Sequence, residues 1–401
     1  MINLLGLPVK SAYSIRVLPD IKSLTREEIE AQFKLWNEPA FRVAQLLDWL
    51  YARRATTWDA MSNLPKILRA KLSENFSLQI LELARKQGAG DTTQKFLWKL
   101  SDGAFIESVL IPANPALYGE ASDRHTLCIS TQVGCAYGCR FCASGLDGWK
   151  RNLGVHEIVE QILATERWNT EQVRNAECGM RNINPAAPAQ ITPHSALPTP
   201  RSVDNIVVMG MGEPLANYDN LIKALKILNA PWGGGIGARR ITISTSGLAP
   251  QIRKLAVEPM QFRLAISLHG ATDEVRNRIM PVNKKYPLHE LTGACEDYQK
   301  VKGRMITLEY ILIAGINDAL DQTRPLALLA KKLYAKINLI PYNKVEGLPW
   351  VRPADEVCER FVAALEKLDV TATLRREKGG DIDAACGQLR LKTERELAKA
   401  V

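Results

Sequence analysis

From about residue 124 onward, short apolar runs alternate with longer amphipathic stretches. The apolar runs predict buried strands, and the amphipathic stretches predict helices. Strands are expected at 125–131, 205–209, 240–245, 263–268, 305–312 and 336–341, and helices at 157–168, 220–229, 288–300 and 326–334. Six β–α alternations predict an α/β fold whose parallel sheet curls into a partial or full barrel. Functional residues are then expected at the carboxyl ends of the strands.

Residues 1–85 are expected to form a small helical domain. Thr25 and Glu28 have the spacing of a capping box at the start of its first helix. Residues 86–120 are expected to form a β-hairpin extension, because two apolar runs flank a Ser-Asp-Gly turn. Alternation along the second of these runs directs Glu107 toward solvent.

Residues 121–379 are then the core domain, and residues 380–401 form a C-terminal loop and tail. A segment rich in Pro, Ala, Asn and Thr interrupts the core at about 169–203. This composition does not support a packed core, so we expect Asn169–Arg201 to be a surface loop or partly disordered.

Three cysteines follow the first core strand. Cys135, Cys139 and Cys142 have Cys-x3-Cys-x2-Cys spacing. Three thiolates so close together can hold one face of an iron–sulfur cluster and leave one iron without a protein ligand. A structural zinc site needs a fourth nearby Cys or His, and none follows closely. Three free buried thiols or an incomplete zinc knuckle are the alternative readings.

Polar groups follow several other strands. The second core strand runs into Gly210-Met-Gly-Glu, where glycines let a ligand approach the backbone and Glu213 can accept from an ammonium group. A Rossmann fingerprint would need glycine at Leu215. Alone, this motif is equally consistent with a tight turn. The other strand-end groups, which are also common as helix caps or turn residues, include Ser244, Ser267, Leu268, His269 and Asn343.

Two further cysteines stand apart from the cluster motif. Cys386 lies among glycines, acids and small residues, a composition typical of an exposed loop in which a thiol can react. Cys128 lies on the first core strand. Cys178, Cys295 and Cys358 are expected to be small buried residues without chemistry.

Composition narrows the class of protein. The formal net charge is +9, which favours a polyanion such as RNA, although many basic proteins bind none. The absence of a long apolar run or a signal peptide, together with clustered cysteines, predicts a cytoplasmic protein that does not span a membrane. A monomer is expected because no dimer seam stands out.

Taken together, these motifs resemble those of the radical S-adenosylmethionine (SAM) RNA adenine carbon-2 methyltransferases. The resemblance extends from about residue 25 to residue 390. It implies a partial (β/α)6 TIM-like barrel of the radical SAM class. The most specific matches are Thr126-Leu-Cys-Ile-Ser, the cysteine motif, Met209-Gly-Met-Gly-Glu-Pro-Leu, Ser244-Thr-Ser-Gly, Ile266-Ser-Leu-His, Asn283-Lys-Lys-Tyr, Ile337-Asn-Leu-Ile-Pro and Asp381-Ile-Asp-Ala-Ala-Cys-Gly-Gln-Leu.

The resemblance implies roles for individual residues. The cysteines of the motif would hold a [4Fe-4S] cluster, and the substrates would be 23S rRNA at the peptidyl-transferase centre and the adenosine 3′ of the tRNA anticodon. The SAM contacts would be Gly212, Glu213, Ser244, Ser267, Leu268, His269 and Asn343. A reducing partner of the flavodoxin type is implied as well.

The same resemblance implies a reaction that uses two SAM molecules per turnover. Cys386 would take a methyl group from one, and the second would give a deoxyadenosyl radical that abstracts hydrogen from the methylcysteine. The carbon radical would add to adenine carbon 2. Glu107 would then remove the proton from that carbon. This role, implied by the resemblance, replaces the solvent-facing position that alternation predicts for Glu107. Cys128 would attack Cys386 to release product and leave a transient disulfide.

Three alternatives remain open at this stage. The related carbon-8 rRNA adenine methyltransferase, which confers antibiotic resistance, would share the cluster and both cysteines. A zinc-containing RNA-binding protein would need neither reductant nor Cys386. A radical enzyme acting on a small molecule would need neither Cys386 nor the basic charge. Lys284, Lys285, Arg375 and Arg376 are candidate RNA contacts.

Overall fold

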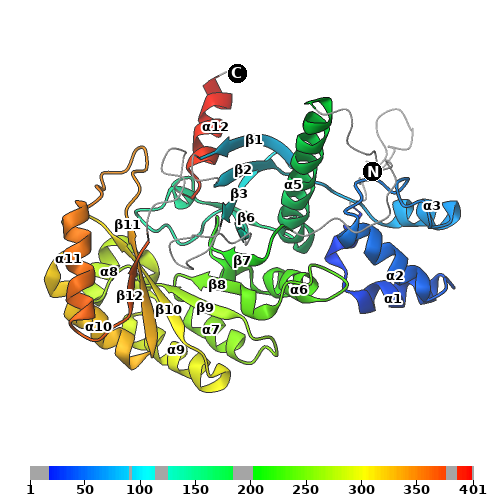
Figure 1. Ribbon diagram of the computed structural model, residues 1–401. Coiled ribbons are helices and arrows are strands. Elements are labelled where there is room, and N and C mark those ends of the chain that lie inside the picture. Colours follow the sequence, from blue (N-terminus) through cyan, green and yellow to red (C-terminus); the bar gives the residue numbers. More distant parts are fainter. Residues whose placement is uncertain (1–17, 90–92, 113–124, 184–201, 376–385, 400–401) are drawn as a thin grey trace, which may run out of the picture.

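The computed structural model describes residues 18–89, 93–112, 125–183, 202–375 and 386–399 (Figure 1). Within them, one large sheet has ten strands in the order β1-β2-β3-β4-β7-β8-β9-β10-β11-β12. The first four strands pair antiparallel, and β4 to β12 pair in parallel. The strands are β1 (Glu82–Gly88), β2 (Gln94–Lys99), β3 (Phe105–Pro112), β4 (His125–Cys128), β7 (Asn205–Val208), β8 (Ile241–Thr245), β9 (Arg263–Ser267), β10 (Ile306–Leu312), β11 (Ala335–Pro341) and β12 (Ala372–Leu374).

The predicted α/β fold with a partial barrel is confirmed. All six predicted core strands are present, and β1 and β12 form the two unpaired edges of the open sheet. Two strands of this sheet were not predicted, for physical reasons. β1 is an exposed, charged edge strand without apolar alternation, and β12 has only three residues. A small hairpin of β5 (Gln132–Gly134) and β6 (Trp149–Asn152) flanks the cysteine motif.

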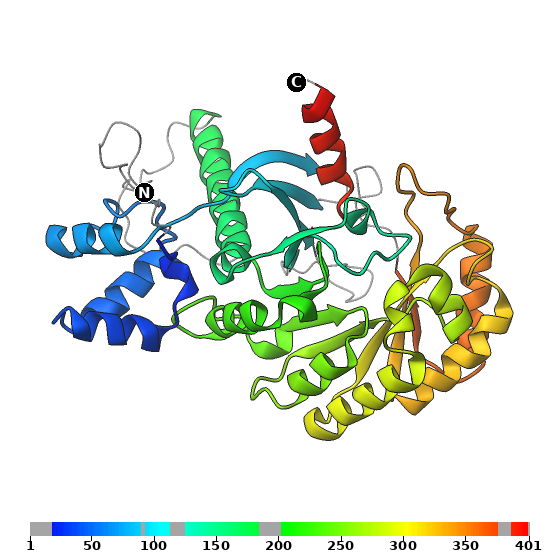
Figure 2. The same ribbon diagram turned by 180° about the vertical axis from the view of Figure 1, so that it is seen from behind.

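Helices cover the outer side of the curved parallel sheet (Figure 2). The core helices are α5 (Val155–Ile183), α6 (Tyr218–Asn229), α7 (Ala249–Ala256), α8 (Asp273–Ile279), α9 (Leu288–Lys302), α10 (Thr323–Lys332), α11 (Asp355–Glu366) and α12 (Gln388–Lys399). No helix in the described part of the chain is long and apolar enough to cross a bilayer.

The prediction of a loop from residue 169 onward is wrong for its first half. Helix α5 continues to Ile183. Residues 169–183 contain Glu, Gln, Arg and Ala and no proline, so they extend a helix whose first turns are already fixed by packing. The prolines that dominated the composition begin at Pro185, and residues 184–201 lie outside the described residues.

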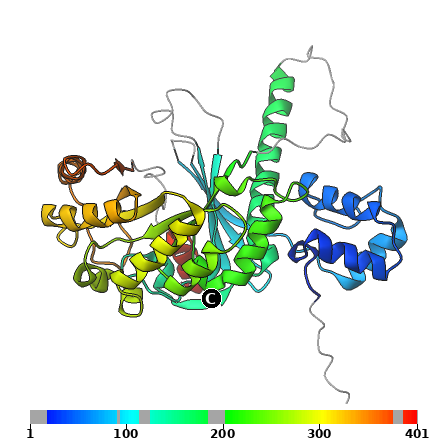
Figure 3. The ribbon, with the colours of Figure 1, turned by 90° about the horizontal axis from the view of Figure 1, so that it is seen from below.

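The amino-terminal helices are α1 (Arg26–Leu35), α2 (Phe41–Leu47) and α3 (Lys66–Asn75). The predicted capping box is present, with Thr25 N–H donating to Glu28 Oε2 (2.7 Å) and Glu28 N–H to Thr25 Oγ1 (3.4 Å). These helices lie beside α5, at the opposite end of the molecule from α10 and α11 (Figure 3). The domain boundaries near residues 85, 120 and 379 stay predictions.

Buried charges join the amino-terminal unit, which comprises residues 18–75, to α5. Lys22, in the 3-10 helix η1 (Ile21–Ser23), places its Nζ 2.7 Å from Glu160 Oε2, and both side chains are 2% exposed. Arg167 also contacts Glu160. A second pair, Arg54 Nη2 with Glu166 Oε2 at 3.4 Å, lies nearby and is also buried. The two carboxylates of α5 therefore need cations from the amino-terminal unit.

A Lys22→Met variant should therefore lose about 2–4 kcal/mol of unfolding free energy, because Glu160 keeps only Arg167 as a partner. The measurement is urea unfolding followed by circular dichroism. Lys223→Met is the control, because Lys223 of α6 pairs with Glu28 of α1, so this ion pair also joins the amino-terminal unit to the core but stays partly exposed. That control should lose less than about 1 kcal/mol. Equal losses of unfolding free energy in the two variants would contradict the conclusion that the Lys22–Glu160 pair matters because it is buried.

Candidate functional site

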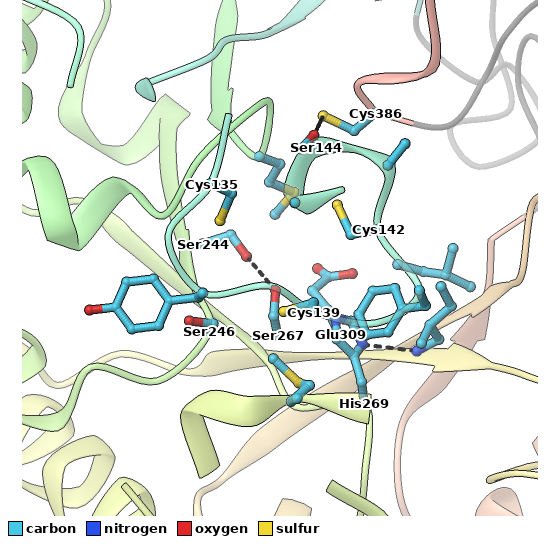
Figure 4. A pocket seen from close by; sticks show the side chains of 18 of the residues that line it. Cys135, Cys139, Cys142, Ser144, Ser244, Ser246, Ser267, His269, Glu309 and Cys386 are labelled. Carbon is cyan, nitrogen blue, oxygen red and sulfur yellow. Dashed lines mark hydrogen bonds between the residues drawn. The ribbon is translucent and has the colours of Figure 1, made fainter. Parts of the chain in front are cut away.

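A pocket of about 360 Å³ lies at the carboxyl ends of the parallel strands. Its wall comes from the cysteine loop, the ends of β7 to β11, and the start of the C-terminal segment (Figure 4). Ten of the thirteen predicted site residues line it: Cys135, Cys139, Cys142, Gly212, Glu213, Ser244, Ser267, His269, Asn343 and Cys386. The other three, Leu268, Glu107 and Cys128, do not line it.

The three cysteines of the motif face this pocket together (Figure 4). Burial, reinforced by the neighbouring thiols, raises the pKa of Cys135 to about 11 and the pKa of Cys139 well above its usual value. Three thiols in such surroundings need a cationic centre to become thiolates. No described group of three or more His, Cys, Asp or Glu is arranged to hold a single metal ion. Three converging cysteines without a fourth ligand fit a [4Fe-4S] cluster with one open iron.

Glycine is required where the cysteine loop meets its neighbours. Gly134 has φ +75°, and a Cβ there would lie 1.9 Å from the carbonyl oxygen of Gly148. At Gly212, with φ +101°, a Cβ would lie 2.5 Å from Gln132 Cβ. These two contacts bring the β5–β6 hairpin and the turn after β7 to the same side of the pocket.

Glu213 links the ends of two strands. Its carboxylate accepts from Thr245 Oγ1 (2.8 Å), Ser246 N–H (2.7 Å) and Leu215 N–H (3.0 Å). Burial raises the pKa of Glu213, and these hydrogen bonds oppose that rise. The carboxylate is thus fixed at the pocket wall, where it can still accept from an ammonium group.

Arg276 on α8 is a site residue that the sequence did not reveal. Its fully buried guanidinium donates to Ser267 O (3.0 Å), Leu268 O (2.5 Å) and Asn283 Oδ1 (2.9 Å), and also to Ser246 O. Burial lowers the pKa of Arg276 to about 10. One cation therefore satisfies the backbone carbonyls at the ends of β8 and β9.

His269 follows β9 with φ +54°. Its Nδ1 accepts from Ile311 N–H (3.0 Å), and burial lowers its pKa to about 3. The ring is therefore neutral and carries its proton on Nε2. The Phe141 ring meets it edge to face, with centroids 4.9 Å apart.

The remaining predicted cofactor contacts differ in how they face the pocket. Ser244 and Ser267 lie with their Oγ atoms 3.3 Å apart at the pocket wall, and Asn343 lines it after β11. Leu268 is buried, and its N–H donates to Glu309 O (3.0 Å). Its side chain does not reach the pocket.

Cys386 lies at the pocket, directly before α12. Ser144 Oγ donates to its sulfur at 3.4 Å (Figure 4). Burial and the nearby Glu107 carboxylate raise the pKa of Cys386 well above its usual value. Gly387 has φ +83°, and a Cβ there would lie 2.7 Å from Ser144 Oγ. A glycine at 387 therefore allows the close approach of the C-terminal segment to the cysteine loop.

Glu107 is only 2% exposed, so the prediction from alternation is wrong. Both faces of β3 are covered. Ser108 Oγ donates to Gln161 of α5 (2.9 Å) on one face, and Glu107 accepts from Gly387 N–H and Arg390 N–H at the start of α12 on the other. A strand buried on both faces has no solvent side to which alternation could direct a carboxylate.

Cys128 ends β4, and burial raises its pKa to about 11. Cys128 and Cys386 are both free thiols, so the structure gives no support to a disulfide between them. Cys295 and Cys358 are buried, as predicted. The side chain of Cys178 lies outside the described residues.

Three charged residues that line the pocket were not among the predicted site residues: Glu309, Arg352 and Arg375. Glu309 on β10 is 5% exposed, its Oε2 accepts from Asn338 Nδ2 (3.0 Å), and burial raises its pKa. The signal in the sequence was a single acid inside an apolar strand. Arg375, which the sequence suggested only as a candidate RNA contact, lines the same pocket, whereas Arg376 lies outside the described residues.

Known proteins resemble this chain along most of its length. Residues 19–78 match the ribosomal RNA large subunit methyltransferase N-terminal domain, and residues 199–324 match the radical SAM superfamily. The probable dual-specificity RNA methyltransferase RlmN 3 of Opitutus terrae is 54% identical over 94% of this chain and 96% of its own. The probable dual-specificity RNA methyltransferase RlmN of Akkermansia muciniphila is 51% identical over 94% and 97%. This chain belongs to the RlmN family.

The RlmN family membership makes this protein a radical SAM RNA methyltransferase. The crystal structure of a radical SAM methyltransferase from Sphaerobacter thermophilus is similar, with a TM-score of 0.79 and 40% sequence identity. The similarity covers 92% of this chain and 98% of that chain. The radical SAM family implies a [4Fe-4S] cluster and SAM, which the converging thiols of the pocket fit.

Arg276→Met should lower the unfolding free energy by about 3 kcal/mol or more, because several buried carbonyls lose their donor. It should also weaken SAM binding, since those carbonyls fix Ser246 and Ser267. Unfolding in urea and equilibrium dialysis with SAM measure the two effects. Arg278→Met, an exposed position on the same helix, should change neither. Equal behaviour of the two variants would refute the assigned role of Arg276.

Proposed function

We propose that this protein methylates carbon 2 of adenosine in 23S rRNA at the peptidyl-transferase centre and in tRNA 3′ of the anticodon, with Cys386 as the methyl carrier. The observation that carries the proposal is the position of Cys386 in the wall of the pocket that holds the three converging cysteines. The names of the relatives, which describe dual-specificity RNA methyltransferases, support two RNA substrates.

In this proposal Cys135, Cys139 and Cys142 hold the cluster, and one SAM site lies beside it. When bound, the cluster supplies the electron that cleaves SAM, and two SAM molecules per turnover supply the methyl group and the hydrogen-abstracting species. The SAM contacts are Gly212, Glu213, Ser244, Ser267, Leu268, His269 and Asn343. Glu213 accepts from the amino group, and Leu268 contributes through its backbone.

The chain's own residues then have three tasks. The Cys386 thiol loses its proton and takes the methyl group by displacement. Glu107, directly behind Cys386, accepts the proton that leaves adenine carbon 2. Cys128 attacks the sulfur of Cys386, so that the S–C bond to the RNA breaks and an S–S bond forms. The released carbon takes up a proton to become the methyl group of the RNA, and a reductant must reset the disulfide. A flavodoxin-type electron donor and a monomeric state remain part of the proposal.

The first expected outcome concerns the protein before RNA is added. In the cluster-loaded protein incubated anaerobically with SAM, the tryptic peptide Gly379–Arg390 should gain the mass of one methyl group on Cys386. Tandem mass spectrometry locates the modified residue. A peptide that stays unmodified while product forms would contradict the carrier role.

The second expected outcome concerns the product nucleoside. Digestion of treated 23S rRNA fragments and tRNA should yield 2-methyladenosine, and Cys386→Ala should yield none. Cys358→Ala is the matched control, since Cys358 is buried on α11 and does not line the pocket, and it should stay active. Detection of 8-methyladenosine would instead establish the carbon-8 alternative, and turnover by Cys386→Ala would refute the methylcysteine route.

A further inference from the structure

Glu107 is held by three donors of its own chain. Its Oε2 lies 2.7 Å from Gly387 N–H and 2.9 Å from Lys95 Nζ, and its Oε1 lies 2.7 Å from Arg390 N–H. Lys95 and Glu107 are 0% and 2% exposed. The carboxylate therefore sits in the interior with a cation from the adjacent strand β2 and two backbone donors from α12.

One backbone donor is Gly387, the residue directly before α12, and the other is Arg390 in the first turn of the helix. The start of a helix leaves N–H groups without partners inside the helix. A carboxylate at that point satisfies them and interacts favourably with the positive end of the helix. Glu107 is thus the cap of α12, and the position of α12 sets the position of Cys386.

Contacts on the far side of Cys386 show how tightly this segment fits. Gly387 approaches Ser144 so closely that a Cβ would overlap it, and Ser144 Oγ donates to the Cys386 sulfur. The Arg390 side chain, fully buried, reaches Asp147 (3.1 Å) and Glu394 (2.6 Å). A release of the first turn of α12 would therefore shift the thiol relative to the cysteine loop.

The strength of this cap depends on charge. A carboxylate accepts hydrogen bonds about twice as strongly as a neutral carboxyl group, and a buried ammonium needs a negative partner. A proton on Glu107 would weaken its bonds to Lys95 and to α12 at the same time. The group that caps α12 is also the group that receives a proton in the proposed function.

We propose that Lys95 is a positioning residue that keeps Glu107 in place as a latch on α12. With Glu107 charged, the latch holds Cys386 at the pocket; when Glu107 takes the proton from adenine carbon 2, the first turn of α12 is released and Cys386 can move away. The source of that proton rests on the proposed function, whereas the latch itself does not.

Hydrogen–deuterium exchange of the RNA-free protein tests the latch. Peptides covering residues 386–399 should exchange about tenfold faster in Glu107→Gln and in Lys95→Met, because a hydrogen bond to a charged group is roughly twice as strong as one to a neutral group. Lys95→Arg, which keeps the cation, should exchange like the unaltered protein. Lys99→Met is the control. Lys99 lies on β2 like Lys95, but it makes an exposed ion pair with Glu82 of β1.

The double variant Lys95→Met/Glu107→Gln guards against misfolding, since it removes both charges of this buried pair together. It should exchange no faster than Glu107→Gln alone, because both changes act on one contact. Unchanged exchange in all variants at Lys95 and Glu107, or equal acceleration in Lys99→Met, would overturn the latch. Since no RNA is present, this failure is distinct from a lack of 2-methyladenosine.

The consequence for Cys386 is measured separately. In cluster-loaded Lys95→Met incubated with SAM, methylation of Cys386 should slow several-fold, and Lys95→Arg should restore it. Fast exchange combined with unaltered methylation would overturn the positioning role of Lys95.

Discussion

The pocket depends on hydrogen-bond partners for the polar groups of the parallel strands where these strands end away from water. Arg276 supplies donors to the ends of β8 and β9, and Glu213 supplies acceptors at the ends of β7 and β8. A buried polar group without a partner costs about 1–3 kcal/mol, so these two side chains decide whether the strand ends can converge at all. Of these two charged side chains, Glu213 lines the pocket, whereas Arg276 supports the pocket wall from behind without lining it.

The same principle recurs on the other side of the molecule. Glu107 brings a charge into a strand buried on both faces, and Lys95 with the start of α12 makes that burial possible. Glu160 and Glu166 likewise bring carboxylates into the buried contact between α5 and the amino-terminal unit, where Lys22 and Arg54 pair with them. In each case a distant segment supplies a cation to a buried carboxylate, so the charges help to specify which segments meet.

The sequence predicted the β–α alternation well, because six strands carried continuous apolar runs. The prediction from sequence failed where burial does not follow the hydrophobic pattern. β1 is a charged edge strand, and residues 169–183 form helix although the Pro-rich half that follows suggested a loop. For the site, Cys135 and Glu213 stood in recognisable motifs at strand ends. Arg276 and Lys95 did not, since their importance comes from long-range contacts that no local spacing encodes.

Helix α5 contacts both halves of the molecule. Its Glu160 and Glu166 pair with the amino-terminal unit, while Gln161 between them bonds Ser108 of β3 and the backbone of Ser130 beyond β4. With 29 residues, the helix is about 43 Å long, at 1.5 Å per residue. All of these contacts fall within residues 160–166, so one short segment of the helix holds the amino-terminal unit and the large sheet at a fixed distance from each other. A large ligand that engaged the amino-terminal helices and the pocket together would have to match that distance.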